Sequence, residues 1–432
     1  MIITDNIGII ADDLTGANEC SLNFHLHGCS TEILIDYKNL EDIEFNKQVW
    51  TISTESRNIE PELAVEKVKE AVETLKNNFN IEFFYKKIDS TLRGNLAHEA
   101  LTMLDVLEWE AALILPALPS ENRITIGGYH LLKGVPIEKT EMARDPHSPI
   151  FESHIPTLLE KQLGENDLIG VLELTTVLKG AGPILMKLNE LISQGKKLIV
   201  CDASSTTDIE QIALAMTKSN HKILPCGSSG LANALADIWV SEANYQKVLN
   251  ALSNVPKFIV SGSATELTKS QLERLDSDAI IDNTHFIPLS ISDILNDNFE
   301  AIETNVLENL SKNNIVVLHS SSLYENEEEL NCALIDAEIT KEAFMSIICD
   351  FLAKIVENVS QKLNPIFITL GGETTYKCCK ALDSTNLMLI DEVAHAIPLC
   401  VDKNSHWIIS KSGNLGNTNT LVDIINYFNQ YE

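Results

Sequence analysis

The chain has 432 residues, which is enough for two domains of ordinary size. Hydrophobic residues make up 44% of it and charged residues 22%, a globular composition that excludes wholesale disorder. The 32 basic against 62 acidic residues give a net charge of −30, which disfavours broad binding to nucleic acid or to an anionic membrane. A small anion can still bind, because a few arginines and lysines focused in a cleft suffice.

Cysteine usage and the first residues indicate the compartment. The nine cysteines lack CxxC spacing, which predicts reduced, buried thiols and no structural zinc site. Residues 1–10 carry the acidic Asp5 and no basic stretch, so no signal peptide is expected. The sequence contains no run of about 20 apolar residues, so no membrane span is predicted. We therefore expect a soluble cytoplasmic protein.

Short apolar runs alternate with longer amphipathic stretches along residues 1–240. The short runs are rich in β-branched and aromatic residues, as strands are, and the apolar spacing after Pro61 is typical of a helix. This alternation predicts an α/β fold with a largely parallel sheet covered on its faces. The expected strands are Ile7–Ala11, Ile33–Ile35, Val49–Ser53, Glu82–Ile88, Ala112–Leu115, Leu168–Val171 and Leu198–Cys201, and the expected helices are Pro61–Lys76, Asn95–Leu107, Pro183–Ser193, Asp208–Thr217 and Ser229–Val240.

A second α/β series follows. The stretch Glu242–Pro256 has weaker periodicity, so we place the domain joint there and expect domains at 1–250 and 251–432. A cleft between two such domains is the default active site. The expected strands are Phe258–Val260, Ile315–His319, Ile366–Leu370 and Trp407–Ser410, and the expected helices lie near Glu342–Val359, Thr374–Leu382 and Thr420–Phe428.

The segment 116–149 does not fit this alternation, because it is rich in proline and charge and has little periodicity. A connection this long inside a compact domain is usually functional, as a lid or a binding loop. The alternative is a structural excursion that covers a sheet edge.

Two adjacent carboxylates, Asp12 and Asp13, directly follow the first expected strand. Loops at the carboxyl ends of strands line the ligand site of an open α/β sheet. One carboxylate can accept a proton from a substrate hydroxyl while the other caps the next helix. The alternative is that Asp13 or Thr15 is only a helix cap.

A cluster of cations and hydroxyls lies at Lys86–Asn95, where an expected strand passes into a helix. Such a position favours anions, because backbone N–H groups are free there. Lys87, Ser90, Thr91 and Arg93 are donors suited to a carboxylate or a phosphate, and Asp89 can orient a hydroxyl. Arg57 lies just past another strand end and is a candidate carboxylate clamp, a surface ion pair being the alternative.

Three glycine-bearing loops follow strands of the second domain, at Ser261–Thr265, Thr369–Thr375 and Lys411–Gly416. Small loops of this kind let a backbone approach a phosphate. None matches the P-loop or the GxGxxG pattern, and each alone is more often an ordinary turn. Three in one domain favour a nucleotide site.

The chain resembles the four-carbon acid sugar kinase family. The resemblance is carried by four motifs in the family's order, Ile9–Ala17, Lys87–Asn95, Gly371–Thr374 and Lys411–Gly416. The block Lys-Ile-Asp-Ser-Thr-Leu-Arg-Gly is highly specific, and the motifs span nearly the whole chain. The resemblance implies an N-terminal sugar-acid-binding domain and a C-terminal nucleotide-binding domain. It also implies ATP-dependent phosphorylation of threonate, erythronate or 3-oxo-tetronate at the 4-hydroxyl.

The resemblance carries site roles onto the matching positions. Asn122 stands where the family usually has glycine, near the substrate, and Glu392–Pro398 lacks the glycine normally found before its last proline, near the nucleotide. The implied catalytic residues are Asp12 and Asp13; the implied substrate-binding residues are Arg57, Lys87, Asp89, Ser90, Thr91 and Arg93; the implied nucleotide-binding residues are Ser261, Gly371, Gly372, Glu373, Thr374, Lys411, Ser412 and Gly413.

We therefore expect a two-domain kinase in which Arg57 and Lys87 hold the acid's carboxylate, and Asp12 or Asp13 takes the hydroxyl proton. Lys411 is expected near the transferred group. Mg²⁺ is expected with ATP on general grounds, although the sequence shows no dedicated ligand cage. Two alternatives are an ATP-dependent ligase that activates a carboxylate and a non-catalytic sugar-acid sensor. No nucleic-acid or membrane partner is expected, and a homodimer is left open.

Overall fold

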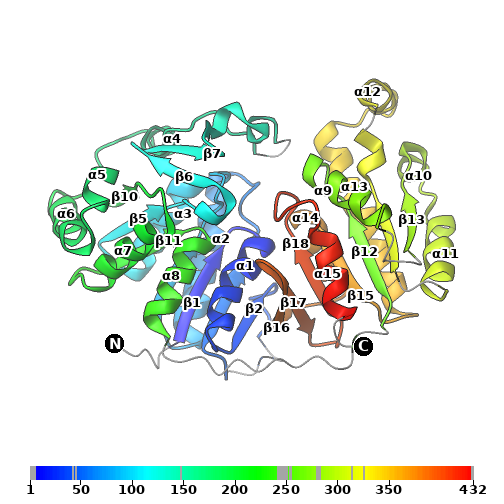
Figure 1. The fold of residues 1–432 in the computed structure, drawn as a ribbon, viewed down its shortest axis with the longest axis horizontal. Helices are drawn as coiled ribbons and strands as arrows, with labels where there is room; N and C mark the ends of the chain where they lie inside the picture. Colours follow the sequence, from blue (N-terminus) through cyan, green and yellow to red (C-terminus); the bar gives the residue numbers. More distant parts are fainter. Residues whose placement is uncertain are drawn as a thin grey trace. The chain divides into compact units, whose positions relative to one another are not determined.

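The computed structural model describes residues 6–40, 43, 46–145, 148–240, 252, 255–278, 284–312, 315–324 and 326–429. The chain divides into two compact units, Met1–Tyr245 and Gln246–Glu432. Most of the expected joint lies outside the described residues. Each unit has mostly parallel strands with helices around them (Figure 1), so the predicted α/β class is confirmed. The predicted cleft between the domains stays a prediction.

The first unit holds parallel strands in the order β2-β3-β1-β4-β11-β5-β10-β9. Most residues of these strands are apolar, and β1 is buried from Ile7 onward, because helices cover both faces of a parallel sheet. Their bounds are β1 (Asn6–Ala11), β2 (Thr31–Leu34), β3 (Val49–Ser53), β4 (Ile81–Lys87), β5 (Ala111–Leu115), β9 (Ile169–Leu172), β10 (Leu198–Cys201) and β11 (Ile223–Gly227).

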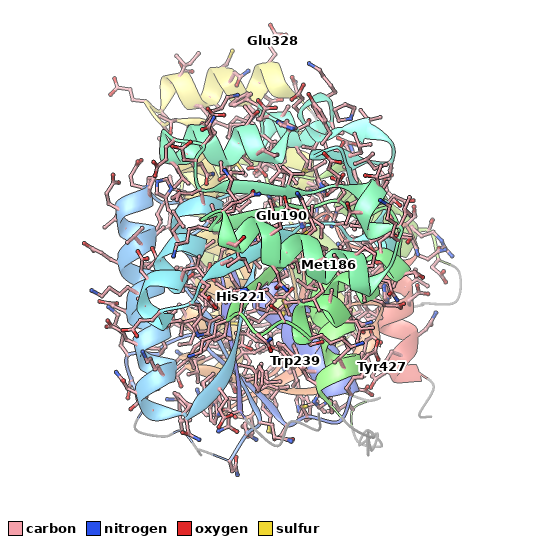
Figure 2. The ribbon with its side chains drawn as sticks, turned by 90° about the vertical axis from the view of Figure 1, so that its left-hand side faces the viewer. Met186, Glu190, His221, Trp239, Glu328 and Tyr427 are labelled. Carbon is pink, nitrogen blue, oxygen red and sulfur yellow. The ribbon has the colours of Figure 1, made fainter. Side chains whose placement is uncertain are left out.

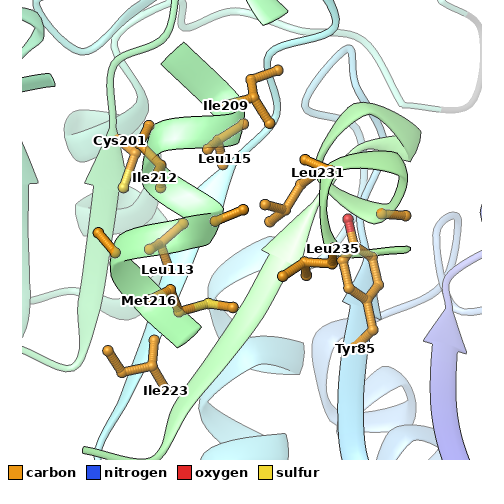
Figure 3. Close-up of a cluster of buried hydrophobic side chains, with 14 of the residues drawn as sticks. Tyr85, Leu113, Leu115, Cys201, Ile209, Ile212, Met216, Ile223, Leu231 and Leu235 are labelled. Atoms are coloured by element: carbon orange, nitrogen blue, oxygen red, sulfur yellow. The ribbon is translucent and has the colours of Figure 1, made fainter. Parts of the chain in front are cut away.

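The helices of the first unit form two layers. One layer holds α1 (Leu14–Leu26), α6 (Ala181–Ser193), α7 (Thr206–Thr217) and α8 (Ser229–Trp239), and the short α5 (Leu174–Val177) precedes α6. The opposite layer holds α2 (Pro61–Asn78), α3 (Leu96–Leu107) and α4 (Ile155–Leu163). Figure 3 shows part of the first core, where Leu113 of β5 and Tyr85 of β4 lie with Ile212 of α7 and Leu235 of α8. Met186 of α6 lies on the outer surface and is 75% exposed (Figure 2).

The strand order of the first unit reverses beside β1. From β1 the chain runs through α1 to β2 and β3 on one side, and then through α2 to β4 on the other side. The loops after β1 and β4 therefore lead to helices on opposite faces, α1 and α3. Open α/β sheets bind ligands at the carboxyl ends of strands at such a reversal. Asp12 follows β1 directly, and Lys87 is the last residue of β4.

Within the segment 116–149, residues 123–136 form a small antiparallel sheet instead of a structureless loop. The Asp202 carboxylate after β10 accepts hydrogen bonds of 2.8 Å from the backbone N–H groups of Gly127 and Gly128, and a ring nitrogen of His130 lies 2.8 Å from the Ser90 carbonyl oxygen. The segment is therefore fastened at the carboxyl ends of β4 and β10. It consists of β6 (Arg123–Ile126), β7 (Tyr129–Leu132) and β8 (Val135–Pro136), with 3-10 turns at Pro119–Glu121, Ile137–Lys139 and Glu141–Arg144.

The second unit holds strands in the order β13-β14-β12-β15-β18-β17-β16, of which β17 and β16 run antiparallel to their neighbours. The strands are β12 (Lys257–Ser261), β13 (Thr284–Pro288), β14 (Ile315–His319), β15 (Ile366–Leu370), β16 (Asn386–Ala394), β17 (Ile397–Asp402) and β18 (Trp407–Lys411). The helices are α9 (Glu266–Asp276), α10 (Ile291–Leu295), α11 (Phe299–Leu310), α12 (Glu327–Asp336), α13 (Lys341–Ser360), α14 (Gly372–Ala381) and α15 (Thr420–Asn429), with a 3-10 turn at Ser321–Tyr324.

The strand order reverses a second time, beside β12. The chain leaves β12 through α9 toward β13 and returns through α13 to β15 on the other side of β12. Right-handed crossovers then place α9 and α13 on opposite faces, and α9 packs with α15 while α14 packs with α13. Ser261 ends β12, and Gly371 directly follows β15.

Two further expectations have clear outcomes. All nine cysteines are free thiols and only Cys332 is exposed, which confirms the predicted use of cysteine as a packing residue. Among the described residues, no helix is both long and apolar enough to cross a membrane.

Candidate active site

Asp12 and Asp13 leave β1 side by side and have different local roles. Asp13 is the N-cap of α1: one of its carboxylate oxygens accepts from the Gly16 N–H at 2.8 Å, and the other accepts from the Thr15 hydroxyl at 2.8 Å. Asp12 caps nothing. A Cβ on Gly16 would lie 2.6 Å from Asp13 Oδ1 and 3.0 Å from Lys87 Nζ, so a glycine is needed where these two groups meet.

Arg57 joins the two aspartates. Its Nε and Nη2 donate to the two oxygens of Asp12 at 2.7 and 3.0 Å, and its Nη1 donates to Asp13 at 2.6 Å. Burial alone would raise the pKa of Asp12, but the charge and hydrogen bonds of Arg57 outweigh it, so this pKa is lowered. The sequence assigns Arg57 to a substrate carboxylate; in the structure its guanidinium is already engaged by two carboxylates of the protein.

The neighbouring lysines of β4 have different surroundings. Lys86 forms an ion pair of 2.7 Å with Glu99, which also accepts from the Ser56 hydroxyl at 2.8 Å, and all three are buried. Lys87 is 3% exposed and donates to the Ile88 carbonyl oxygen at 3.1 Å. Among the described residues, no carboxylate lies within 4 Å of the Lys87 ammonium. Lys87 is thus a buried cation beside Asp13 that forms no direct ion pair among the described residues, although its charge acts on Asp12 and Glu19.

The rest of the expected substrate block is largely paired with itself. Asp89 accepts from the Thr91 hydroxyl and from Arg93 Nε, the latter at 2.7 Å. Arg93 also donates to Asp145 at 2.9 Å. Burial would raise the pKa of Asp89, but Arg93 holds it well below its usual range. Ser90 accepts a hydrogen bond of 2.7 Å from Arg123. Ser90 is therefore bonded to a residue of the small sheet, whereas Asp89 and Thr91 are bonded within the block.

Three charged residues near this site are missing from the expected set. Arg123, the first residue of β6, reaches the site from the small sheet. Glu19 of α1 is half-buried, and burial raises the pKa of its carboxyl group. The charges of Lys87, Asp13 and Arg123 also act on it. Burial beside the aspartates raises the pKa of Glu55 to about 8. Glu55 follows β3 closely, and this position at a strand end could have identified it as a site residue from the sequence. No local sequence feature distinguishes Glu19 or Arg123 from other charged residues.

The three glycine loops of the second unit converge at the second reversal. Gly371 is the N-cap of α14 with φ 109, a left-handed conformation that favours glycine, and its N–H donates to the Lys411 carbonyl oxygen at 2.9 Å. The Thr265 hydroxyl donates to the Gly413 carbonyl oxygen at 2.9 Å, and a Cβ on Gly413 would lie 2.6 Å from Ser263 Oγ. The structure therefore brings together the residues at 261–265, 371–374 and 411–413.

Buried hydroxyls and a lysine surround these loops. The hydroxyl oxygens of Ser261, Ser320 and Tyr324 are buried, and each lacks a hydrogen-bond partner. Lys411 is fully buried and donates to the Ser412 carbonyl oxygen at 2.7 Å. Glu373 lies in the first turn of α14, 3.4 Å from Lys377. Ser320 and Tyr324, at the end of β14, are absent from the sequence prediction because that loop has no glycine signal.

Such close glycine loops with unused hydroxyls fit a phosphate-bearing ligand, since backbone N–H groups and hydroxyls are phosphate donors. The described part of the chain has no group of three or more histidine, cysteine, aspartate or glutamate side chains that could hold a metal ion.

Comparison with known proteins agrees with the two halves of this arrangement. Residues 7–235 match a family model described as a sugar-binding N-terminal domain, and residues 258–421 match one described as a nucleotide-binding C-terminal domain.

Three curated relatives align along nearly the full chain. A D-erythronate kinase of Heliobacterium modesticaldum is 29% identical, covering 98% of this chain and 97% of the relative. A D-threonate kinase of Salmonella typhimurium is 26% identical, with 98% of each chain covered. A 3-oxo-tetronate kinase of Haemophilus influenzae is 26% identical, covering 95% of this chain and 97% of the relative.

Two solved structures share the fold. The Haemophilus influenzae protein HI1011 superposes with a TM-score of 0.70 at 24% identity, covering 98% of this chain and 99% of that one. A Salmonella typhimurium protein titled a putative tRNA synthase superposes with a TM-score of 0.79 at 21% identity, covering 97% and 98%. At these identities the likeness shows the fold alone.

Proposed function

The chain belongs to the four-carbon acid sugar kinase family, and from this premise we propose that it transfers the terminal phosphoryl group of ATP to the 4-hydroxyl of a four-carbon sugar acid. The observation that carries the proposal is the contrast between the two strand-order reversals. Carboxylates and cations gather at the first, and glycine loops with buried hydroxyls gather at the second. A polyhydroxy acid needs the first chemistry, and a nucleoside triphosphate needs the second.

We assign the role of proton acceptor to Asp12. A carboxylate has about four acceptor positions, and Asp13 already accepts from Gly16, Thr15 and Arg57. Asp12 accepts only from Arg57, so it has more capacity left for a substrate hydroxyl. Its lowered pKa keeps it ionised at neutral pH. A weak base suits phosphoryl transfer, because the loose transition state needs orientation more than strong proton abstraction.

The chemical step then balances simply. The 4-hydroxyl oxygen forms a bond to the terminal phosphorus as the bond from that phosphorus to the leaving ADP breaks, and the hydroxyl proton passes to Asp12. ATP supplies the phosphoryl group. Residues 261–265, 371–374 and 411–413 would hold its phosphates, with Lys411 as their buried cation. Mg²⁺ remains part of the proposal and would be held mainly by phosphate and water oxygens.

The decisive experiment measures ADP release and product identity with D-threonate, D-erythronate and 3-oxo-tetronate. We expect one of them to give an acid-stable phosphate ester, detected by phosphorus NMR, and Asp12→Asn to lose turnover. The matched control ligand is the 4-deoxy analogue of the acid that reacts, which keeps the carboxylate and lacks only the acceptor hydroxyl. A kinase of this kind does not consume ATP with that analogue.

The same experiment separates the two alternative functions. A carboxylate-activating ligase would still consume ATP with the 4-deoxy acid and would give a hydroxamate when hydroxylamine is added. A sensor would bind the acids without releasing ADP. Either result would contradict the kinase proposal. The cytoplasmic location and the homodimer stay predictions.

A further inference from the structure

Most cations near the end of β1 and β4 have carboxylate partners. Arg57 is paired with Asp12 and Asp13, and Lys86 is paired with Glu99. Arg93 is likewise held by Asp89 and Asp145. The charges of these three residues are therefore already compensated by the protein itself.

Arg123 and Lys87 are different. Arg123 is 9% exposed; its Nη1 donates to Ser90 Oγ at 2.7 Å, and its Nε has no hydrogen-bond partner. Lys87 is 3% exposed and donates only to a backbone carbonyl oxygen. Within the residues that the structure describes, neither has a carboxylate within 4 Å. A buried cation without a partner is costly, so such a pair points to an anion that comes from outside the chain.

The two cations belong to one site. Ser90, which accepts from Arg123, lies three residues after Lys87 and directly follows Asp89. The charges of both Lys87 and Arg123 act on the carboxyl group of Glu19, so the three side chains belong to one neighbourhood. Glu19 forms no ion pair with either in the described structure. The Nε–H of Arg123 is therefore left for an anion from outside the chain, and under the proposed function that anion is the carboxylate of the sugar acid.

The position of Arg123 is fixed by the small sheet. Asn122 has φ 56, which turns the chain into β6, and asparagine tolerates this left-handed conformation better than most residues. Leu118 and Arg123 form a backbone bridge, and Thr125 pairs with Ala203 after β10. Arg123 is thereby held on a strand, which suits a specific contact better than a mobile loop does.

We propose that Arg123 joins Lys87 in binding the carboxylate of the sugar acid, so that the small sheet of β6, β7 and β8 contributes to the selection for an acid. This inference rests on the proposed function for the identity of the ligand. It leaves Arg57 as the residue that positions Asp12 and Asp13. It also gives the small sheet a binding role, with a guanidinium Nε–H and a lysine ammonium as the donors to the carboxylate.

The test measures binding by calorimetry in the absence of ATP, so that it does not depend on turnover. The ligands are D-threonate, D-erythronate and the matching tetritols, which keep the hydroxyls and lack the carboxylate. We expect Arg123→Gln to weaken binding of the acid roughly 10- to 100-fold, the usual cost of a lost hydrogen bond to a charged group. Affinity for the tetritol should stay within about twofold. The matched control is Lys133→Gln, which removes an exposed cation from the same segment and should change neither affinity.

Folding is checked by thermal melting of each variant. Where Arg123→Gln fails to fold, Arg123→Lys and Lys87→Met carry the test, each expected to weaken binding of the acid and not of the tetritol. Unchanged acid affinity, or an equal loss for acid and tetritol, overturns the proposal. A wild-type protein that binds no four-carbon acid also overturns it. A protein that binds the acid through Arg123 but never phosphorylates it contradicts the kinase proposal alone.

Discussion

Arg57 makes three hydrogen bonds to Asp12 and Asp13, and its side chain is only 11% exposed. Arg57 therefore lowers the pKa of Asp12 and fixes the direction of both carboxylates. A contact of this kind influences the rate of the chemical step more than the affinity for a ligand. The residue-scale predictions below follow from this arrangement.

Arg57→Ala should lower kcat and stability together. It leaves two buried carboxylates without their counter-charge, and breaking a buried pair costs about 3–5 kcal/mol. Urea unfolding and steady-state kinetics measure both effects. If Arg57→Ala only raised the KM for the acid, with kcat and stability intact, Arg57 would be the carboxylate clamp that the sequence alone suggests.

Asp12→Asn and Asp13→Asn should differ. Asp12→Asn should lower kcat by roughly 10²–10⁴-fold, the usual contribution of a positioned base, and the low end suits a loose transition state. Asp13→Asn should keep most turnover, and asparagine also caps helices well, so its melting temperature should change little. Similar kcat losses in both variants would contradict the assignment of Asp12 as the single acceptor.

Glu55 should make stability depend on pH. Its pKa is about 8 in the folded protein and near 4.5 in the unfolded chain, so the folded state holds the proton more tightly. The stability that the protonated Glu55 contributes to the folded state is fully present below pH 4.5 and is lost as pH rises through 8. The unfolding free energy should therefore fall from pH 5.5 to 8.5 by less in Glu55→Gln than in the wild type. The exposed Glu60→Gln serves as the control and should behave like the wild type.

At the scale of elements, the turn between β16 and β17 places Ala396 at φ 60, in the left-handed region. This turn lies in the stretch where the family's usual glycine is missing. A left-handed conformation costs an alanine about 1–2 kcal/mol, partly offset by the lower unfolded-state entropy of alanine compared with glycine. Ala396→Gly should stabilise the protein by about 0.5–1 kcal/mol in urea unfolding. A destabilised variant would mean that the alanine methyl group makes a compensating contact.

Helix α1 shows why some elements escape sequence analysis. Its buried face includes Thr15, Asn18 and Ser21, so the apolar repeat that reveals an amphipathic helix is weak. Those polar residues are buried because α1 starts beside the site and packs close to the strands; the Ser21 hydroxyl, for example, lies 2.6 Å from that of Thr51 on β3. The functional demands on the helix thus obscure its own sequence signal.

At the scale of the whole molecule, each unit has its own strand-order reversal, and each reversal has a different chemistry. We expect hydrogen exchange of the full chain to report this division. The sugar acid should slow exchange in 12–19, 87–95 and 123–130, and a non-hydrolysable ATP analogue should slow it in 261–265, 371–374 and 411–416. Protection of 87–95 by the nucleotide alone, without change near Gly371, would contradict the assignment of the two sites.

The sequence by itself determines the alternation of strands and helices, the apolar strand cores, and the loops that carry chemistry. These are local properties: a run of β-branched residues, a proline at a helix start, or an unusual cluster such as Lys87–Arg93 is visible without the rest of the chain. The same local reading finds Asp12, Asp13 and the glycine loops, because each follows a strand directly.

Tertiary structure alone decides which of those charges are left for a ligand. Arg57 is 44 residues from Asp13, Arg93 is 52 from Asp145, and Arg123 is 33 from Ser90, so their partners depend on strand order and on the small sheet. Electrostatic pairing acts through space over a few ångströms, whatever the separation along the chain. For that reason the sequence can show that cations gather near the site, and only the fold can show that Arg57 and Arg93 form ion pairs with carboxylates while Lys87 and Arg123 form none among the described residues.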